Sequence, residues 1–301
     1  MNGVIVIKKE KEFTSFDVVA VVRRTLHTKK VGHCGTLDPN ATGVLPVLIG
    51  NATKAQDIIP NHDKSYVADF RLGYSSDTLD VWGKVKKEAD TLVTMDELKA
   101  VAENFVGDIM QTPPMYSAVQ KDGVRLYELA RKGIEIEREA RQITVYSLQI
   151  LSFDEEKQEG KLAVSCSKGT YIRSLIADIA EKLGTSAIMT DLVRTSACGF
   201  ELEEAITLDE LKTLAENNEV EKHTKSLESL FVTHDELKVS DKQTHRFKNG
   251  NPLDISRTAL RDKDVADGTI YRVKSMQGDF LALGVVGLSK GVIKIYKHFG
   301  N

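Results

Sequence analysis

The fifteen residues from 32 to 46, Gly-His-Cys-Gly-Thr-Leu-Asp-Pro-Asn-Ala-Thr-Gly-Val-Leu-Pro, constrain this chain more than any other stretch. Three glycines and two prolines are too many for a helix or a regular strand, so we expect a loop. The segment carries apolar side chains and a single carboxylate, Asp38. Charge in a partly buried loop needs a partner. Asp38 before proline is either the cap of a turn or the reactive group of a site, and the density of special residues favours a site.

Length and composition indicate an ordinary globular protein. The 301 residues, 41% hydrophobic and 28% charged, suffice for a sizeable core in two domains and argue against global disorder. The apolar runs are too short to cross a bilayer, and the N-terminus lacks the pattern of a signal peptide, so we expect a cytoplasmic protein. Three widely spaced cysteines, without metal-ligand spacing, predict free thiols and no metal: Cys34, Cys166 and Cys198.

The distribution of charge is more informative than the net charge of −3, which argues against indiscriminate coating of nucleic acid. Four cations and no acid lie between residues 23 and 33, directly before the glycine-rich loop: Arg23, Arg24, Lys29 and Lys30. A second cation-rich region spans residues 121–141. Each region is either a solvated surface or a surface that faces phosphates.

Hydrophobic periodicity predicts a mixture of helices and strands. Residues 3–7 and 47–49 read as strands, and a helix capped by Thr14 or Ser15 runs to about residue 26 with Phe16, Val19 and Val22 on its apolar face. Further strands are expected at 64–72, 143–152 and 161–167, further helices at 94–105, 126–131, 171–183 and 207–216, and a loop at 77–90. From residue 237 short strands alternate with turns, which predicts a separate β-domain over 237–301 after a domain over 1–236.

Several further segments belong with the glycine-rich loop. They are Lys64-Ser-Tyr66, Pro-Pro-Met-Tyr-Ser-Ala at 113–118, Leu-Tyr-Glu at 126–128, Arg-Glu-Ala-Arg at 138–141 and Ser-Lys-Gly-Thr-Tyr-Ile-Arg at 167–173. In their residues and their order along the chain, these segments resemble the motifs of the TruB family of bacterial tRNA pseudouridine synthases. The resemblance implies an α+β fold, with a catalytic domain built on a central mixed or antiparallel sheet flanked by helices. It also implies a small C-terminal PUA-like RNA-binding β-domain and a thumb-like insertion at about 116–142.

The resemblance implies the isomerisation of uridine 55 in the T-loop of tRNA to pseudouridine, without a cofactor. The C1′–N1 bond breaks, the uracil rotates, and C5 then joins C1′. Asp38 matches the family's catalytic aspartate. It acts either as a nucleophile on the sugar or base, or by taking the 2′ proton so that a glycal forms, and the sequence leaves these routes open. A stacked uridine must first be flipped out of the loop.

Other residues match family positions around that aspartate. Arg173 corresponds to the arginine that pairs with it; alone, it would read as a surface arginine at a helix start, where the dipole disfavours a cation. Tyr66 corresponds to the tyrosine that stacks on the target base and assists the final deprotonation at C5, although a core tyrosine is the plainer interpretation. Tyr171 and Leu192 correspond to contacts of the flipped nucleotide, and Leu192 by itself would be a core residue.

Two more residues are expected to bind substrate. His33 matches the histidine that fills the place vacated by the flipped base, against the alternative of a satisfied loop residue. Lys9 is retained from the family's Lys-Pro-x-Gly-x-Thr-Ser, but Glu10 and Glu12 replace the proline and the glycine. Gln120 and Ile188 are further departures, at positions that concern RNA grip and packing.

Three other functions use the same residues differently. The first alternative is a synthase of the same fold that acts on another RNA. The second is a tRNA-folding or RNA-binding protein without catalysis, and the third is an aspartate-nucleophile hydrolase that releases free uracil. The expected partner is the T-arm stem-loop of tRNA, with no membrane and no obligate protein partner, and we expect a monomer.

Overall fold

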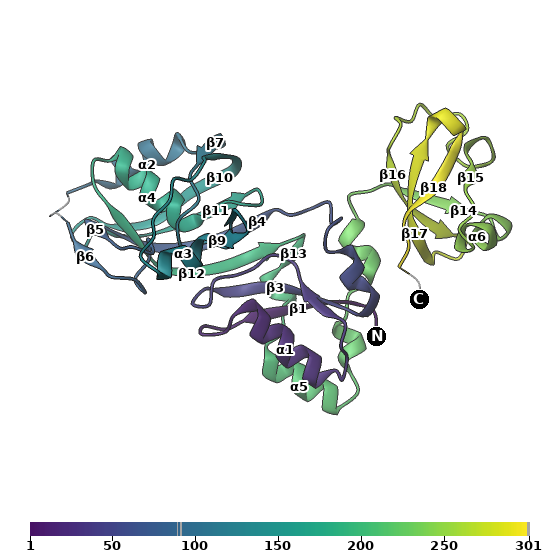
Figure 1. Ribbon diagram of the computed structural model, residues 1–301, viewed down its shortest axis with the longest axis horizontal. Helices are drawn as coiled ribbons and strands as arrows, with labels where there is room; N and C mark the ends of the chain where they lie inside the picture. Colours follow the sequence, from purple (N-terminus) through teal and green to yellow (C-terminus); the bar gives the residue numbers. More distant parts are fainter. Residues whose placement is uncertain (89, 91, 300–301) are drawn as a thin grey trace.

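The computed structural model describes residues 1–88, 90 and 92–299. Residue 89 of the expected 77–90 loop and the last two residues of the expected 237–301 domain therefore lie outside the described part. Figure 1 shows a long sheet-containing body with a smaller β-domain at one end. This architecture confirms the expected α+β class.

Within the described residues, nine strands form the large sheet, with β2 and β13 pairing beside the main path β1-β3-β12-β4-β11-β10-β7. Strands β3 and β12 pair parallel, whereas the other neighbours on this path are antiparallel, so the sheet is mixed. The strands are β1 (Gly3–Lys9), β2 (Val31–His33), β3 (Thr42–Ile49), β4 (Lys64–Leu72), β7 (Gly107–Gln111), β10 (Arg141–Asp154), β11 (Glu159–Cys166), β12 (Ala187–Ala197) and β13 (Phe200–Glu201). Short pairs are β5 (Tyr74–Ser75) with β6 (Lys86–Lys87), and β8 (Gln120–Lys121) with β9 (Val124–Arg125).

The bounds of the helices are α1 (Ser15–Thr25), α2 (Met95–Glu103), α3 (Leu126–Arg131), α4 (Ile172–Lys182), α5 (Leu208–Glu216) and α6 (Asp241–Lys248). Helices α1 and α5 lie together along one part of the large sheet and α2 and α4 along another, whereas α3 belongs to the projecting segment after β7 and α6 to the small domain (Figure 1). Capping boxes begin α1, α2 and α5 at Thr14, Thr94 and Thr207. The cap satisfies backbone N–H groups that a helix start leaves unpaired, which explains why these three boundaries follow from the sequence.

The glycine-rich segment departs from the expectation of one continuous loop. Its ends form β2 and β3, and the irregular part spans only residues 34–41. Strand β3 tolerates Pro46 because this residue lies between the part of β3 that pairs with β2, from residue 47 onward, and the part that pairs with β12, at Thr42 and Gly43. On this edge the Pro46 carbonyl accepts from the Cys34 N–H at 2.9 Å, and no ladder bond needs the N–H that proline lacks. Gly43 has a φ of +106°, and a Cβ there would lie 2.1 Å from the Arg194 carbonyl oxygen. The parallel contact with β12 therefore requires glycine.

One expected core residue is wrong. Helix α1 buries Val18, Val19 and Val22, but Phe16 is 69% exposed. A helical repeat of apolar residues gives the approximate buried face, and Phe16 lies outside the face that packs on the sheet.

The small C-terminal sheet has five strands in its described part, in the order β14-β16-β17-β18-β15. They are β14 (Glu236–Val239), β15 (Leu253–Asp254), β16 (Ile270–Ser275), β17 (Phe280–Gly287) and β18 (Val292–Lys297). Phe231, fully buried ahead of this domain, contacts Phe280 and Phe299 within it. This aromatic cluster joins the β-domain to the rest of the chain.

Among residues 1–88, 90 and 92–299, no helix combines the length and the apolar character that a membrane crossing requires.

Candidate active site

Two buried side chains hold the loop that carries Asp38. Ser15, at the start of α1, accepts a hydrogen bond from the Leu37 N–H at 3.0 Å and donates to the Leu37 carbonyl at 3.3 Å. The Lys9 ammonium donates to the carbonyls of Glu10, Phe13 and Pro39 at 2.7–2.8 Å. The backbone on both sides of Asp38 is thereby tied to β1 and α1.

The geometry of Lys9 differs from the expected role in binding substrate. Its side chain is 0% exposed and three carbonyls use its ammonium, so the contacts favour a clamp on the loop over direct contact with RNA. Burial lowers the pKa of Lys9 to about 8, against the opposing influence of Asp38. Glu12, which stands in place of the glycine of the family pattern quoted above, adopts a φ of +67°, in the left-handed region.

Arg194 on β12 anchors the same loop and was not predicted from the sequence. It is 0% exposed, and its guanidinium donates to the carbonyls of Val44, Thr36 and Gly35 at 2.7, 3.2 and 3.1 Å. Because β12 and β4 are paired, Arg194 lies opposite Tyr66. The planar fork of arginine suits this task, since it presents several donors in fixed directions. Arg194 thus joins the loop of Asp38 to the centre of the sheet.

Asp38 and Arg173 lie together, as the family resemblance implied. The Asp38 Oδ2 and the Arg173 Nη2 are 2.9 Å apart, with side chains 47% and 7% exposed. Arg173 stands in the first turn of α4, where the helix dipole disfavours a cation, so the carboxylate compensates for an unfavourable placement. The result is a half-exposed carboxylate fixed by a buried cation.

Asp80 is a second carboxylate at Arg173, and no pattern in the polar loop that carries it predicts this position. Its Oδ2 lies 3.6 Å from the Arg173 Nη1, while its Oδ1 accepts from the Thr78 hydroxyl at 2.6 Å and the Trp82 N–H at 3.1 Å. Burial raises the pKa of Asp80, although Thr78 and Arg173 act in the opposite direction. Asp80 therefore serves as an acceptor that orients the guanidinium.

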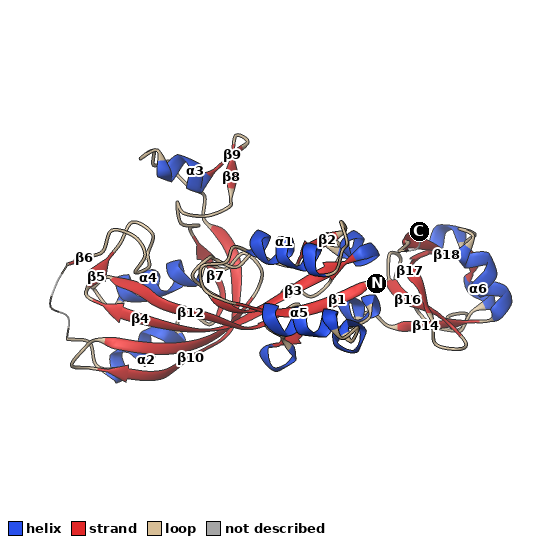
Figure 2. Ribbon diagram, turned by 90° about the horizontal axis from the view of Figure 1, so that it is seen from below, coloured by secondary structure: helices blue, strands red, loops and turns tan. Residues whose placement is uncertain are grey.

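Two carbonyls complete the surroundings of Arg173. Its Nη1 donates to the Thr78 carbonyl at 3.0 Å and its Nη2 donates to the Tyr116 carbonyl at 3.1 Å. Tyr116 begins the 116–142 insertion, whose β8, β9 and α3 stand clear of the sheet in Figure 2. The arginine that pairs with Asp38 is therefore also bonded to the root of the projecting insertion.

Tyr66 and Leu192 line the interior beside the loop. They belong to one core cluster with Leu37, and their exposures are 7% and 5%. Burial raises the pKa of Tyr66 to about 12, while a hydrogen bond with Arg194 acts to lower it. Tyr66 is consequently a neutral phenol at physiological pH.

His33 ends β2 immediately before the loop. It is 9% exposed, and its Nδ1 is buried without a hydrogen-bond partner among the described residues. Burial, followed by the charge of Arg194, lowers its pKa, so the neutral imidazole is favoured. The ring of Phe16 meets it edge to face, with centroids 5.4 Å apart.

Tyr171 is the N-cap residue of α4, two positions before Arg173. The amide of Gln111 binds its backbone on both sides, accepting from the Tyr171 N–H at 2.8 Å and donating to its carbonyl at 3.1 Å. Gln111, which is 2% exposed, thus ties the end of β7 to the start of α4. Its positioning role was not predicted.

Cys34 faces the interior. It packs in a core cluster with Cys198, and all three cysteines are free and buried. A hydrogen bond to Cys198, together with burial, raises the pKa of the Cys34 thiol, which argues against a thiolate nucleophile. No cluster of metal-ligating side chains occurs in the part of the chain that the structure describes.

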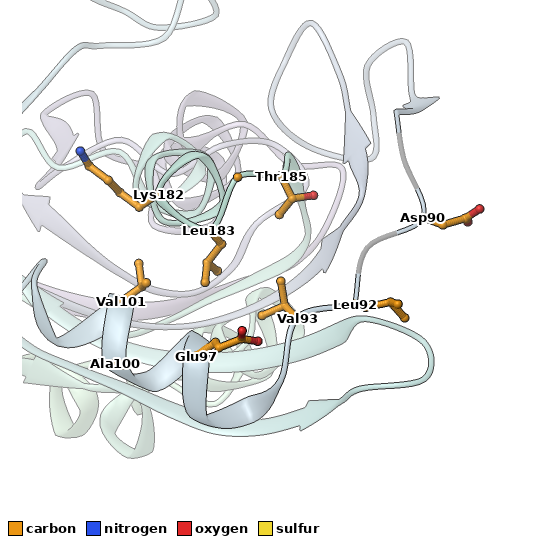
Figure 3. Close-up of a pocket in the computed structure, with 10 residues that line it drawn as sticks. Asp90, Leu92, Val93, Glu97, Ala100, Val101, Lys182, Leu183 and Thr185 are labelled. Carbon is orange, nitrogen blue, oxygen red and sulfur yellow. The ribbon is translucent and has the colours of Figure 1, made fainter.

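A separate hollow of about 580 Å³ lies between α2 and the end of α4 (Figure 3). Val93, Val101 and Leu183 border it, with Glu97 and Thr185 at its margin. Its described lining contains neither Asp38 nor any other predicted site residue. We therefore assign the site to the Asp38 loop.

Comparisons with known proteins agree with this assignment of the fold. The profile of the TruB family pseudouridylate synthase N-terminal domain matches residues 23–172. That of the tRNA pseudouridylate synthase B C-terminal domain matches 173–237, and that of a PUA-like domain matches 237–298.

Individual relatives cover nearly the whole chain. The tRNA pseudouridine synthase B of Clostridium perfringens strain SM101 is 46% identical over 285 residues, which cover 94% of this chain and 95% of the relative. The Clostridium acetobutylicum protein of the same name is 42% identical over 297 residues, 99% of each chain. A chain of a solved Cbf5-Nop10-Gar1 complex superposes with a TM-score of 0.74 at 26% identity, covering 99% of this chain and 85% of that one. This chain therefore belongs to the TruB family of pseudouridine synthases.

Proposed function

We propose that this chain isomerises uridine 55 in the T-loop of tRNA to pseudouridine, with Asp38 as the catalytic carboxylate. Membership of the TruB family and the relatives' names support a tRNA substrate. The observation that carries the proposal is the pairing of the half-exposed Asp38 with the buried Arg173 at 2.9 Å. A carboxylate held in this way presents itself to a ligand at a defined position.

The surroundings of Asp38 suit a reaction at a nucleotide that has left its stack. Arg173, Ser15 and Lys9 fix the loop and the carboxylate before substrate arrives, so little reorganisation is needed during the reaction. Asp38 either attacks the substrate or takes the 2′ proton, and both routes use the exposed part of its side chain. Flipping the uridine costs a few kcal/mol, which contacts in the pocket must offset.

Tyr66, Leu192 and Tyr171 are proposed to hold the flipped uracil. Tyr66 offers a rigid ring on the sheet beside Leu192, and its pKa of about 12 means that it acts as a phenol and not as a phenolate. His33 is proposed to enter the RNA loop in place of the departed base. A neutral imidazole suits that role, because an aromatic ring without charge stacks between bases.

The insertion at 116–142 is proposed to close over the RNA as a thumb. Its Tyr127 is flanked by the guanidinium groups of Arg125 and Arg131, 5.9 and 5.3 Å from the ring centroid. These exposed cations are suited to phosphates, and the Tyr116 carbonyl links the thumb to Arg173. The basic segment from Arg23 to Lys30 would contact the backbone of the same RNA.

The test is the release of tritium from tRNA transcripts labelled at C5 of uridine, with purified protein and no added partner or cofactor. Wild-type protein is expected to release one equivalent from a transcript with uridine at position 55 and none from the transcript with cytidine there. Release from the control transcript would place the reaction elsewhere. Free uracil in the products would indicate hydrolysis, and binding without release would indicate a non-catalytic RNA-binding protein.

A further inference from the structure

Phe16 is an exposed aromatic side chain next to the loop that carries Asp38. It is 69% exposed in the first turn of α1, directly after the Ser15 that holds Leu37. A single exposed apolar residue is ordinary on a protein surface. This one lies beside the Asp38 loop, so its exposed ring is available to whatever approaches the loop.

The contact of Phe16 with His33 leaves its ring accessible. The two rings are inclined at 84° with centroids 5.4 Å apart. In such an edge-to-face pair, His33 covers at most one of the two faces of Phe16. The Nδ1 of His33 is buried without a hydrogen-bond partner among the described residues, although the residue is nine-tenths buried. The imidazole that meets Phe16 is therefore held by packing within the described residues.

The direction of α1 leads from this ring to cations. Phe16 contacts His33, the last residue of β2. Arg23 donates to the carbonyl of Val31, the first residue of β2, at 3.0 Å. Arg23 lies seven positions after Phe16 on the helix, a rise of about 10 Å. Arg24, next along the chain, is exposed. An aromatic ring followed by cations is the arrangement that proteins use for single-stranded nucleic acid.

We propose that Phe16 is a second base-stacking site, on which an unpaired nucleobase of the bound RNA loop, other than the target uridine, stacks. This inference rests on the proposed function for the identity of the RNA. The face of Phe16 that His33 leaves open receives the base, and His33 lies between this base and the target nucleotide. Stacking accepts any base, so the site adds affinity and fixes the loop without reading sequence.

A double-mutant cycle tests the stacking. Dissociation constants are measured for wild-type protein and Phe16→Ala with the T-arm stem-loop and with stem-loops that carry one abasic nucleotide at each loop position in turn. Phe16→Ala is expected to weaken binding of the intact stem-loop on the order of ten- to a hundredfold. At one abasic position the difference between the two proteins should disappear.

Matched variants separate stacking from packing. Phe16→Trp is expected to bind like wild type, and Phe16→Leu, which keeps an apolar contact with His33 but has no ring, is expected to bind like Phe16→Ala. Leu151→Ala, an exposed site on β10 at 45%, is the control and should leave binding unchanged.

The outcomes distinguish this inference from the proposed function. Wild-type affinity in Phe16→Ala or Phe16→Leu, or an equal loss at every abasic position, overturns the stacking site even if wild-type protein releases tritium. A position-specific loss in a protein that releases no tritium supports the stacking site and overturns the proposed function. With active protein, Phe16→Ala should raise KM and leave kcat within about threefold, since uniform binding is what it removes.

Discussion

Replacing Arg194 by lysine should destabilise the protein and slow the reaction, although Arg194 does not contact Asp38. Lysine keeps the charge but cannot reach the carbonyls of Val44, Thr36 and Gly35 together, because its ammonium is a single point on a flexible stem. A hydrogen bond to a charged group contributes about 1.5–3 kcal/mol. If lysine loses two of these three hydrogen bonds and the surrounding backbone relaxes in part, the free energy of unfolding should fall by about 2–4 kcal/mol.

The measurement is urea unfolding together with single-turnover tritium release at a temperature where both proteins are folded. We expect an unchanged m-value, a lower midpoint, and a rate reduced by about tenfold or more, because residues 35 and 36 support the backbone that leads to Asp38. Arg257→Lys is the matched control, at a side chain 77% exposed, and should change stability by less than about 0.5 kcal/mol. If Arg194→Lys matches wild type in both midpoint and rate, the anchoring of the loop by Arg194 is refuted.

Three further predictions concern single residues. Asp80→Asn keeps an oxygen that accepts from Thr78 and Trp82 but removes a carboxylate whose pKa is raised by burial. We therefore expect slower tritium release and a free energy of unfolding equal to or above that of wild type at pH 7. An unchanged rate would contradict the role of Asp80 in orienting Arg173. Glu12→Gly relieves a φ of +67° and should raise the urea midpoint, by up to about 1 kcal/mol in unfolding free energy; a lower midpoint would contradict this reasoning. Burial, and then the charge of Glu181, raises the pKa of Asp178 to about 6. The contribution of Asp178 to the free energy of unfolding is therefore fully present below pH 4 and is lost as the pH rises through 6. Asp178→Asn should therefore stabilise the protein at pH 7, on the order of 1 kcal/mol after allowance for solvent, with the difference shrinking toward pH 4; the same difference at both pH values would exclude titration of Asp178 as its cause.

The parts of the fold that the sequence predicts are those governed by local chemistry. The caps at Thr14, Thr94 and Thr207 fix helix starts through side chains three residues apart. The alternation of Tyr66, Ala68 and Phe70 reflects a strand with one buried face. Strand β12 is not predicted because its mixed composition gives no alternation, and its two long partners, β3 and β4, lie more than a hundred residues away in the sequence.

The site likewise contains residues that the sequence predicts and residues that only the fold reveals. Asp38 stands out as the one carboxylate in a breaker-rich segment, and the family resemblance supplied Arg173, which the structure brings to it. Arg194 and Asp80 could not be predicted, because the local sequence does not distinguish a buried charged side chain from an exposed one. Phe16 shows the converse, since a helical apolar repeat predicted burial where the packing leaves exposure.

The most direct test of the account is tritium release by Asp38→Asn, measured in single turnover with saturating protein and accompanied by the dissociation constant for the same tRNA. The amide keeps the size of the side chain but is neither a nucleophile nor a base, so the rate should fall by at least about a thousandfold while binding stays within about threefold of wild type. Release at the wild-type rate would contradict the assignment of Asp38 as the catalytic carboxylate.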